Sequence, residues 1–465
     1  MNTNTSFSNF FYQSNLKEAL DLDSSATKSI LVIDYCGVRD IYPVMDELAE
    51  GLLPTKLFYL SALAARADFK NKIKSDLVNI IRPPDSVWYN DRNRLNSVIG
   101  REKCEGLKEI SLLKRLLKKS LSNDKSDIDS GIVENQIKTA YYFTLLAIRT
   151  INPELVIIWN QFHPLSKTAI RACENSGVQY SFFEYGVIPG TLNFDFKGQM
   201  GESAVATESE KFSALPLNNS DLDAAKKSLE YLLNTGLNRK VLPPLKGLEN
   251  SIGEIAGGRK IILFAGHNDP SSGLIPYTEK VSKSHSPIFT SSHSAAKYLI
   301  SKARRNNWLL LYKPHPHDNK GCFIPNTFDH IMVTDSNINE CIDVADVTVT
   351  VLSQTSSIAL IRKKPVVMLG YNHLRDSGAV YQAENIHDIE SKINMALENG
   401  LTEDMLSSWH NHVSRILKYY SYSYGSNNPD EIGAQQLENL AAALNFAITA
   451  KKFSDFQTFE TVPKI

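Results

Sequence analysis

This sequence has little cysteine, no long apolar run and no excess of charge of either sign. Its 465 residues include five scattered cysteines with no CxxC pair, namely Cys36, Cys104, Cys173, Cys322 and Cys341. An odd, dispersed set argues against a disulfide framework and favours a reducing compartment. No apolar run reaches the roughly 18 residues of a membrane span, and residues 1–15 lack the pattern of a secretory signal. We therefore expect a cytoplasmic protein.

Positive and negative side chains are balanced, with 50 Lys and Arg against 51 Asp and Glu and a net charge of −1. This balance excludes nucleic-acid binding driven by bulk charge. The local exception is a basic helix face formed by Lys114, Arg115, Lys118 and Lys119. We favour a solvated surface for this face. The alternative is attraction to an anionic membrane surface, which would hold the protein peripherally at the inner face of the membrane.

The sequence also lacks the common ligand-binding motifs. Neither GxGxxG nor GxxxxGK[ST] occurs, and the eleven histidines form neither HExxH nor a cluster with cysteine. We therefore expect no structural metal. His410 and His412, on a predicted helix, are expected at the surface.

Short apolar runs alternate with longer helical patterns along most of the chain, which is typical of parallel sheets covered by helices. We expect an α/β protein with two Rossmann-like sheets. Strands are predicted at 30–35, 78–81, 155–160, 179–186, 260–266, 308–312, 330–335, 347–352 and 365–370. Helices are predicted at 107–122, 131–151, 165–177, 295–307, 337–346, 356–364, 402–420 and 428–452.

Paired prolines and paired glycines between 237 and 258 interrupt this rhythm and indicate a linker. The pattern predicts a first domain at 1–245, a second domain at 246–425 and a helical tail at 426–465. Residues 268–294 are rich in Ser, Pro and His, so we expect a mobile loop that is too polar for the core. Ligands bind outside the carboxyl ends of strands in open α/β sheets, so a cleft is expected there between the two domains.

Lys313 and His315 follow a predicted strand in the segment YKPHP. Residues two apart on an extended chain point to the same side, and the prolines exclude a helix. A Lys and a His held in this way suit an anionic ligand such as phosphate. The alternative is a surface turn whose polar side chains face water, and the pattern alone favours neither.

Four hydroxyls stand within the five residues SQTSS (353–357), between a predicted strand and a predicted helix. Capping of the helix uses one hydroxyl, so it does not explain why the segment contains four. A helix N-terminus offers free N–H groups and the positive end of the helix dipole, which favour phosphate. This segment and YKPHP both follow strands after residue 258, so together they predict a nucleotide phosphate site in the second domain.

Carboxylates also stand at predicted strand ends. Glu184 lies between aromatic residues and a Gly/Pro bend, which suits general acid–base catalysis. Asp269, in the segment GHND, follows the first strand of the second domain and is a candidate nucleophile or structural cap. Asp195 is a rival carboxylate, Asp34 ends the first strand, and the segment WNQ (159–161) is placed to contact acceptor hydroxyls.

The segments WNQ, EYGVIPGT, GHND, YKPHP, SQTSS and KKPVVMLG together resemble motifs of the transferases that build capsule and lipopolysaccharide polysaccharides. More narrowly, they are similar to the retaining β-Kdo transferases, which use CMP-β-Kdo. The resemblance covers about residues 150–372. It implies the GT-B architecture, in which two Rossmann-like domains face each other across a cleft, with the acceptor on the first domain and the CMP-sugar on the second.

The resemblance also implies roles for individual residues. Asp269 matches the nucleophilic aspartate, Glu184 the acid/base glutamate, and His315 the histidine that meets the CMP phosphate. The expected nucleotide site is completed by Lys313, Gln354, Thr355, Ser356 and Ser357. No metal or other cofactor is implied. The donor would be CMP-β-Kdo, and the acceptor a lipid-linked or oligosaccharide chain.

Two alternatives stay open at this point. Many relatives carry a Glu soon after the hydroxyl turn, where this chain has Ile358, so another CMP-sugar or a UDP-sugar remains a candidate donor. The other alternative is a non-catalytic, nucleotide-sugar-binding component of a polysaccharide assembly complex. The presence of both Glu184 and Asp269 speaks against it, because a binding module needs no second carboxylate.

Overall fold

The computed structural model describes residues 28–37, 41–61, 73, 75–83, 113–114, 130–237, 248–316, 323–424 and 432–450. Several expectations lie outside these residues: the segment 1–15, most of the helix at 107–122, part of the linker and of the helix at 428–452, Arg115, Lys118, Lys119, Cys104 and Cys322. Of the basic face, Lys114 is described, and its ammonium pairs with Glu134 at 2.5 Å. The described cysteines Cys36, Cys173 and Cys341 are free thiols.

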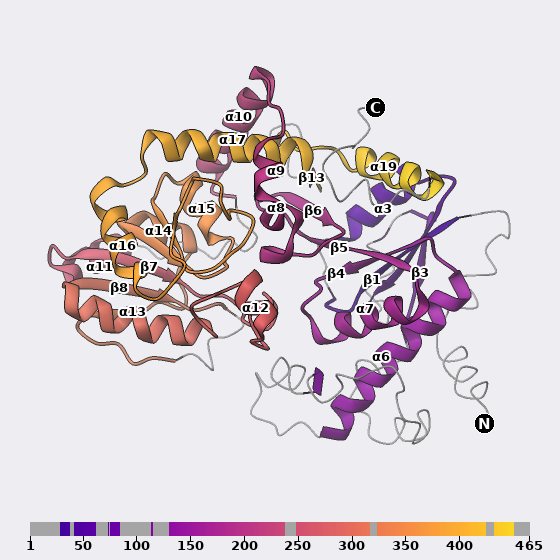
Figure 1. Cartoon of the computed structure of the whole chain (residues 1–465), viewed down its shortest axis with the longest axis horizontal. Helices are drawn as coiled ribbons and strands as arrows, with labels where there is room; N and C mark the ends of the chain where they lie inside the picture. The colour runs from indigo at the N-terminus through magenta and orange to yellow at the C-terminus, as the bar shows by residue number, and fades with distance from the viewer. Residues whose placement is uncertain are drawn as a thin grey trace. The chain divides into compact units, whose positions relative to one another are not determined.

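The first sheet has the strand order β13-β6-β5-β4-β1-β2-β3 (Figure 1). Its strands are β1 (Ser29–Asp34), β2 (Lys56–Ser61), β3 (Val78–Ile81), β4 (Leu155–Trp159), β5 (Gln179–Tyr185), β6 (Thr191–Asp195) and β13 (Ser421–Ser423). The strands from β3 to β5 pair in parallel, and β13 runs antiparallel to β6. Strands β1 to β6 therefore follow the Rossmann order, and the order reverses between β1 and β4.

The second sheet has the order β12-β11-β10-β7-β8-β9, and all its pairs are parallel. Its strands are β7 (Lys260–Ala265), β8 (Trp308–Lys313), β9 (His330–Met332), β10 (Val347–Thr350), β11 (Val366–Met368) and β12 (Tyr381–Gln382). This order is again that of a Rossmann sheet, and the reversal falls between β7 and β10. The expected α/β class with two Rossmann-like sheets is confirmed.

The helices cover these sheets. Those in the first half are α3 (Tyr42–Gly51), α6 (Ser130–Ile151), α7 (Pro164–Ser176), η3 (Met200–Glu202), α8 (Ala204–Thr207), α9 (Ser209–Ser213) and α10 (Asn219–Thr235). Those in the second half are α11 (Leu248–Ala256), α12 (Glu279–Ser284), α13 (Ser292–Asn306), α14 (Ile338–Val344), α15 (Thr355–Ile361), α16 (Asp388–Asn399), α17 (Glu403–Tyr419) and α19 (Leu437–Ala450). No helix within the described ranges has the length and apolar character needed to cross a membrane.

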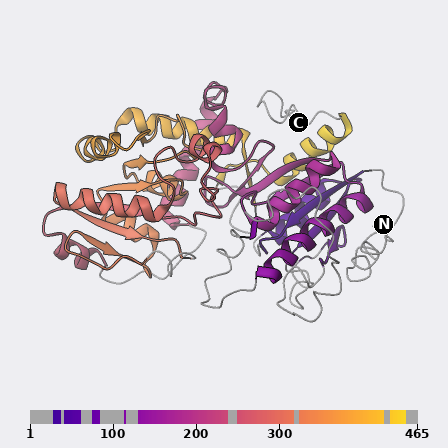
Figure 2. The ribbon, with the colours of Figure 1, turned by 60° about the horizontal axis from the view of Figure 1, so that its bottom comes forward.

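The chain divides into two compact units, and neither is a single stretch of sequence. The first contains residues 1–184, 194–199 and 436–465, and the second contains 185–193 and 200–435. This division differs from the boundaries expected at 245 and 425. The difference has a physical cause: α10 packs on α17, which keeps residues 200–235 with the second unit, and α19 packs beside α3 in the first unit (Figures 1 and 2).

The continuous apolar strands make the centre of each unit. Every residue of β1 and β4 is buried, as expected for parallel strands covered on both faces. Local signals set the helix ends: α7 begins at Pro164 and is terminated by Gly177, which has the left-handed backbone (φ +67°) that glycine adopts without strain. α13 begins with a capping box between Ser291 and Ser294.

The expectation that 268–294 is a polar loop outside the core is wrong. The segment contains α12 and the start of α13, and it buries both apolar and polar side chains, including Leu274, His285, Ser286 and Phe289. The Ser and His residues that suggested a solvated loop form hydrogen bonds inside the protein instead. Composition alone did not reveal these bonds, because they join residues from different loops.

His412 is buried rather than exposed, so that expectation is also wrong, whereas His410 is exposed as expected. The His412 ring lies parallel to that of Trp409 and meets the Phe212 ring edge-on. Burial and the nearby charges of His373 and Arg415 lower the pKa of His412 to about 3.

This burial predicts an acid-sensitive fold. The unfolded chain binds a proton at His412 near the ordinary pKa of 6.5, whereas the folded chain does so only near pH 3. The contribution of neutral His412 to the free energy of unfolding is therefore complete above pH 6.5. Below that pH, it falls by about 1.4 kcal/mol per pH unit as the pH drops toward 3. Denaturant titrations of His412→Phe between pH 7 and 4 should show a smaller loss than the unaltered protein. The exposed His387→Gln variant should keep the full slope, and equal slopes for all three would contradict the assignment.

Candidate functional site

Three of the expected site segments leave the same edge of the second sheet. In the strand register Ala265, at the end of β7, pairs with Lys313 of β8 on one side and with Thr350 of β10 on the other. The N–H of Gly266 then donates to the Lys313 carbonyl at 2.9 Å. GHND and SQTSS therefore begin on the two sides of the point where the strand order reverses, and YKPHP begins at the neighbouring end of β8. Such sheets bind ligands at this edge.

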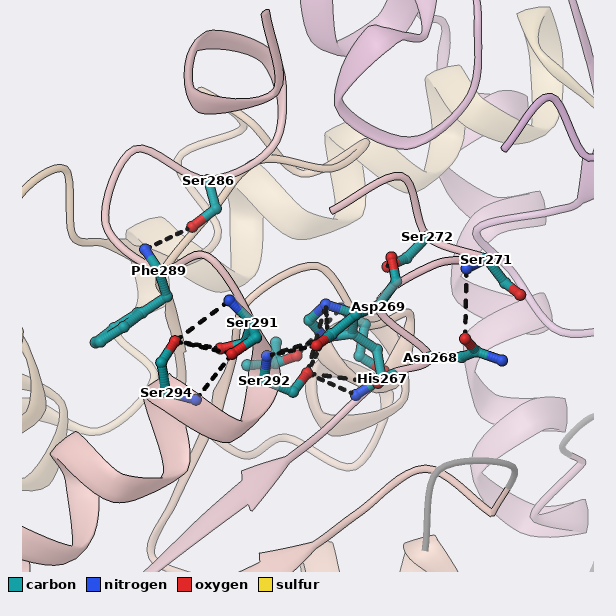
Figure 3. A network of polar contacts seen from close by, with 12 residues as sticks. His267, Asn268, Asp269, Ser271, Ser272, Ser286, Phe289, Ser291, Ser292 and Ser294 are labelled. Carbon is teal, nitrogen blue, oxygen red and sulfur yellow. Dashed lines mark hydrogen bonds and ion pairs between the residues drawn. The ribbon is translucent and has the colours of Figure 1, made fainter. Parts of the chain in front are cut away.

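Asp269 is the centre of a buried polar network (Figure 3). The backbone N–H of Ser292, at the start of α13, donates to Asp269 Oδ1 at 3.0 Å and to Oδ2 at 3.1 Å. His267 Nε2 lies 3.3 Å from Oδ1. The Asp269 side chain thus occupies the N-terminus of α13, where the helix dipole favours a negative charge. Only 3% of Asp269 is exposed.

Lys313 and His315 differ in their surroundings. Lys313 is buried, and its ammonium donates to the carbonyls of Ser336 at 2.6 Å and Thr334 at 3.3 Å. Burial lowers the pKa of Lys313, and Cys341 and Asp335 oppose this. An ammonium carries three hydrogens, so two of them are engaged within the protein. His315 is half-buried, one residue before the exposed Pro316.

The hydroxyl turn bonds largely to itself. Ser353 Oγ donates to Thr355 Oγ1 at 2.9 Å and accepts from the Thr355 N–H, while Ser356 Oγ donates to the Ser353 carbonyl. Asn372 also donates to Ser356 Oγ at 3.3 Å. Ser356 and Ser357 are buried, whereas Ser353 and Thr355 are half-buried. Thr355 is therefore the more accessible hydroxyl of the expected nucleotide contacts at 355–357.

Gln354, in the hydroxyl turn, bonds to the backbone of Tyr185, the residue after Glu184. Its Nε2 donates to the carbonyl of Tyr185 at 2.9 Å. Glu184 is half-buried at the end of β5, next to the fully buried Phe183. The bend that follows is closed by the Gly186 N–H, which donates to the Thr191 carbonyl at 2.7 Å. A side chain on Gly186 would place its Cβ 1.8 Å from Thr191 Oγ1, so this hairpin requires glycine.

The other expected polar residues shape loops at the edge of the first sheet. Asp34 Oδ1 accepts from the N–H groups of Cys36 and Gly37, both at 2.9 Å. Asn160 is left-handed (φ +57°), and its side chain caps the start of the following turn. Asp195 Oδ1 accepts from the N–H groups of the next turn, at 2.6 and 3.2 Å. Each of these side chains holds its own loop.

Sequence reasoning missed a second ionic cluster, in which the half-buried Glu202 pairs with the buried His285 and the exposed Lys280. Burial acts to raise the pKa of Glu202, but hydrogen bonds from His285 and Lys280 outweigh it and lower the pKa to about 2. His285 Nε2 lies 3.3 Å from Glu202 Oε1, and Lys280 Nζ lies 2.7 Å from Glu202 Oε2. Gly201 beside it has no room for a side chain, because a Cβ would lie 1.7 Å from the Ser284 carbonyl. The cluster therefore ties η3 to the first turn of α12, through Lys280, and to the residue that follows α12, His285.

Sequence reasoning also missed His267 and Ser292, although both stand in segments that it singled out. The available signal was the pair of serines at 291 and 292 directly before a helical pattern, which predicts a capped helix start. Among the described residues, no group of three or more His, Cys, Asp or Glu side chains is arranged to hold a metal ion.

Comparison with known proteins gives a distant likeness of shape. No protein-family model and no curated protein matches the chain. The solved structures similar to it include the β-Kdo 2,7 transferase KpsC of Thermosulfurimonas dismutans, with 17% identity over 73% of this chain and 96% of that chain and a TM-score of 0.39. A Methanocaldococcus jannaschii UDP-GlcNAc 2-epimerase is 10% identical over 84% of this chain and 99% of that chain, with a TM-score of 0.36. A glycosyltransferase of Rickettsia africae is 11% identical over 91% and 98%, with a TM-score of 0.35. At these TM-scores the likeness is one of overall shape and does not indicate an activity.

Proposed function

We propose that the protein is a retaining glycosyltransferase that moves Kdo from CMP-β-Kdo to a growing surface polysaccharide or glycolipid. The observation that supports this most is the shared origin of GHND, YKPHP and SQTSS at one sheet edge. It brings a carboxylate-bearing loop and two candidate phosphate-binding segments to neighbouring strand ends, which is the combination that a retaining transfer from a sugar nucleotide requires.

In the first displacement, an oxygen of the Asp269 carboxylate forms a bond to the anomeric carbon of Kdo. The bond between that carbon and the phosphate oxygen breaks, and CMP leaves with the electron pair. A phosphate leaving group needs cations and N–H donors rather than a proton. His315 and the start of α15 are the proposed sources, with Thr355 as the accessible hydroxyl.

In the second displacement, the acceptor hydroxyl attacks the same carbon, and the Asp269 oxygen leaves with its electron pair. The hydroxyl proton passes to Glu184, which acts as the general base. Two inversions at one carbon give net retention. The half-buried position of Glu184 and the tie from Gln354 to the adjacent Tyr185 carbonyl support this role, because a general base must be held in place.

Comparing donors tests the proposal most directly. Full-length protein is incubated separately with CMP-Kdo, CMP-sialic acid and UDP-GlcNAc, and released nucleotide is measured with and without an oligosaccharide acceptor. We expect that, of the three donors, CMP-Kdo is the one from which nucleotide is released. Release from another donor would replace the substrate assignment but keep the transferase, and binding of a nucleotide without release would indicate a non-catalytic component.

His315→Ala is expected to weaken CMP binding by about 1–3 kcal/mol, the usual value of one charge-assisted contact. This corresponds to a roughly 5- to 150-fold higher Kd in calorimetry. The matched control is His387→Ala, because His387 is an exposed histidine at the start of α16 and is not among the expected site residues. An unchanged Kd for His315→Ala would remove His315 from the nucleotide site.

A further inference from the structure

The His267 ring lies between the Asp269 carboxylate and the Ser292 hydroxyl, which link the start of α13 to the loop after β7. Its Nε2 is 3.3 Å from Asp269 Oδ1, and its Nδ1 is 3.1 Å from Ser292 Oγ (Figure 3). The Ser292 hydroxyl also accepts from the backbone N–H of His267 at 3.2 Å. His267 and Asp269 are 5% and 3% exposed. The imidazole is therefore fixed on both nitrogens inside the protein.

The partners determine where the ring carries hydrogen. A bare Nε2 would face a carboxylate oxygen with two lone pairs opposed, which is unfavourable in a buried site. Nε2 must therefore bear a hydrogen and donate to Asp269. Ser292 Oγ lies 3.1 Å from Nδ1 and 3.4 Å from the His267 carbonyl, so its hydrogen has two acceptors within reach. The carboxylate therefore fixes a hydrogen on Nε2, whichever role Nδ1 takes toward the hydroxyl.

We propose that His267 is the positioning residue of Asp269: its Nε2–H fixes the plane of the carboxylate and leaves Oδ2 to attack. Within the described part of the chain, Oδ1 receives both the His267 donor and the Ser292 N–H, whereas Oδ2 receives the shared Ser292 N–H alone. The oxygen with fewer donors keeps more of its negative charge for the sugar. This inference rests on the proposed function, which makes Asp269 the nucleophile.

The same arrangement answers a difficulty of the chemistry. Kdo carries a carboxylate beside its anomeric carbon, and this group repels an approaching Asp269. A donor held against Asp269 reduces that repulsion, because hydrogen bonding withdraws negative charge from the carboxylate. Lys313 is poorly placed for this task, since its ammonium binds the carbonyls of Thr334 and Ser336. Of the described side chains, His267 is the one whose donor lies against Asp269, with Nε2 at 3.3 Å from Oδ1.

Two replacements separate positioning from simple packing. The amide nitrogen of Gln reaches the place of Nε2, while that of Asn reaches the place of Nδ1. We expect His267→Gln to keep kcat within about 10-fold of the unaltered protein and His267→Asn to lose about 10²-fold, because misplacement of a reacting group by about 1 Å costs that much. KM for CMP-Kdo should stay unchanged in both. Equal losses in the two variants, or a loss that falls on KM alone, would overturn the inference.

A second measurement does not depend on the donor. In full-length protein labelled with ¹⁵N-histidine, the His267 ring signals are assigned from their absence in His267→Gln. We expect the Nε2-protonated form in the unaltered protein and a changed Nε2 signal in Asp269→Asn. A bare Nε2, or a signal that Asp269→Asn leaves unchanged, would overturn the pairing. If the pairing holds and CMP-Kdo is not consumed, the proposed function fails and the pairing stands.

Discussion

Asp269→Asn is expected to lower kcat for Kdo transfer by at least about 10³-fold, because an amide oxygen is too weak a nucleophile to replace a carboxylate. The variant should fold normally, since the Asn Oδ1 still accepts the Ser292 N–H that holds the start of α13. CMP affinity should be retained, because no nucleotide contact is assigned to Asp269. Steady-state rates and CMP calorimetry on the same preparation check both statements.

The covalent intermediate gives the sharper test of Asp269. Protein incubated with CMP-Kdo without acceptor should gain the mass of one Kdo residue, and peptide mapping should place it on the peptide that contains Asp269. The rival is Asp195, whose Oδ1 is engaged by two N–H groups of its own turn. An adduct on the Asp195 peptide, or a product of inverted configuration, would rule out Asp269 as the nucleophile.

Glu184→Gln is expected to slow transfer by about 10²–10⁴-fold, the usual cost of losing a general base. Glu184→Gln and Asp269→Asn should block different steps. Departure of CMP needs no acid, so Glu184→Gln should still release one equivalent of CMP and accumulate the Kdo adduct. Asp269→Asn should form no adduct.

A control for this experiment is Glu210→Gln, because Glu210 is an exposed residue of α9. It should show ordinary turnover and no accumulated adduct. Near-normal turnover of Glu184→Gln would remove Glu184 from the mechanism. A Glu184→Gln protein that neither releases CMP nor forms the adduct would show that Glu184 acts before the second displacement.

Apolar pattern predicted the strands that form the centre of each sheet, because a parallel strand covered on both faces has a continuous apolar sequence. β1, β4, β7 and β8 are confirmed within one or two residues of their expected ends. The edge strands β12 and β13 have two and three residues, and pairing with a neighbour defines them. The sequence SYS of β13 becomes a strand only because β6 lies beside it.

The candidate site was predictable to the level of strand ends and no further. The positions of GHND, YKPHP and SQTSS after neighbouring strands follow from the strand pattern together with the Rossmann order. The direction in which each side chain points does not follow from that pattern. Alternation suggested that Lys313 and His315 face one ligand, but the carbonyls that follow β9 bind the Lys313 ammonium. The Asp269 network joins residues 23 and 25 apart in sequence, and no local pattern records such bonds.

The packing of α19 beside α3 affects the order in which the protein folds during synthesis. The first unit needs residues from both ends of the described chain: α3 at 42–51 and α19 at 437–450. Thr55 Oγ1 donates to Asn445 Oδ1 at 2.8 Å, and Asn445 in turn donates to the Leu52 carbonyl. The second unit is complete in sequence once residue 435 has emerged from the ribosome. It can therefore finish folding before the unit whose first strand was made some 400 residues earlier.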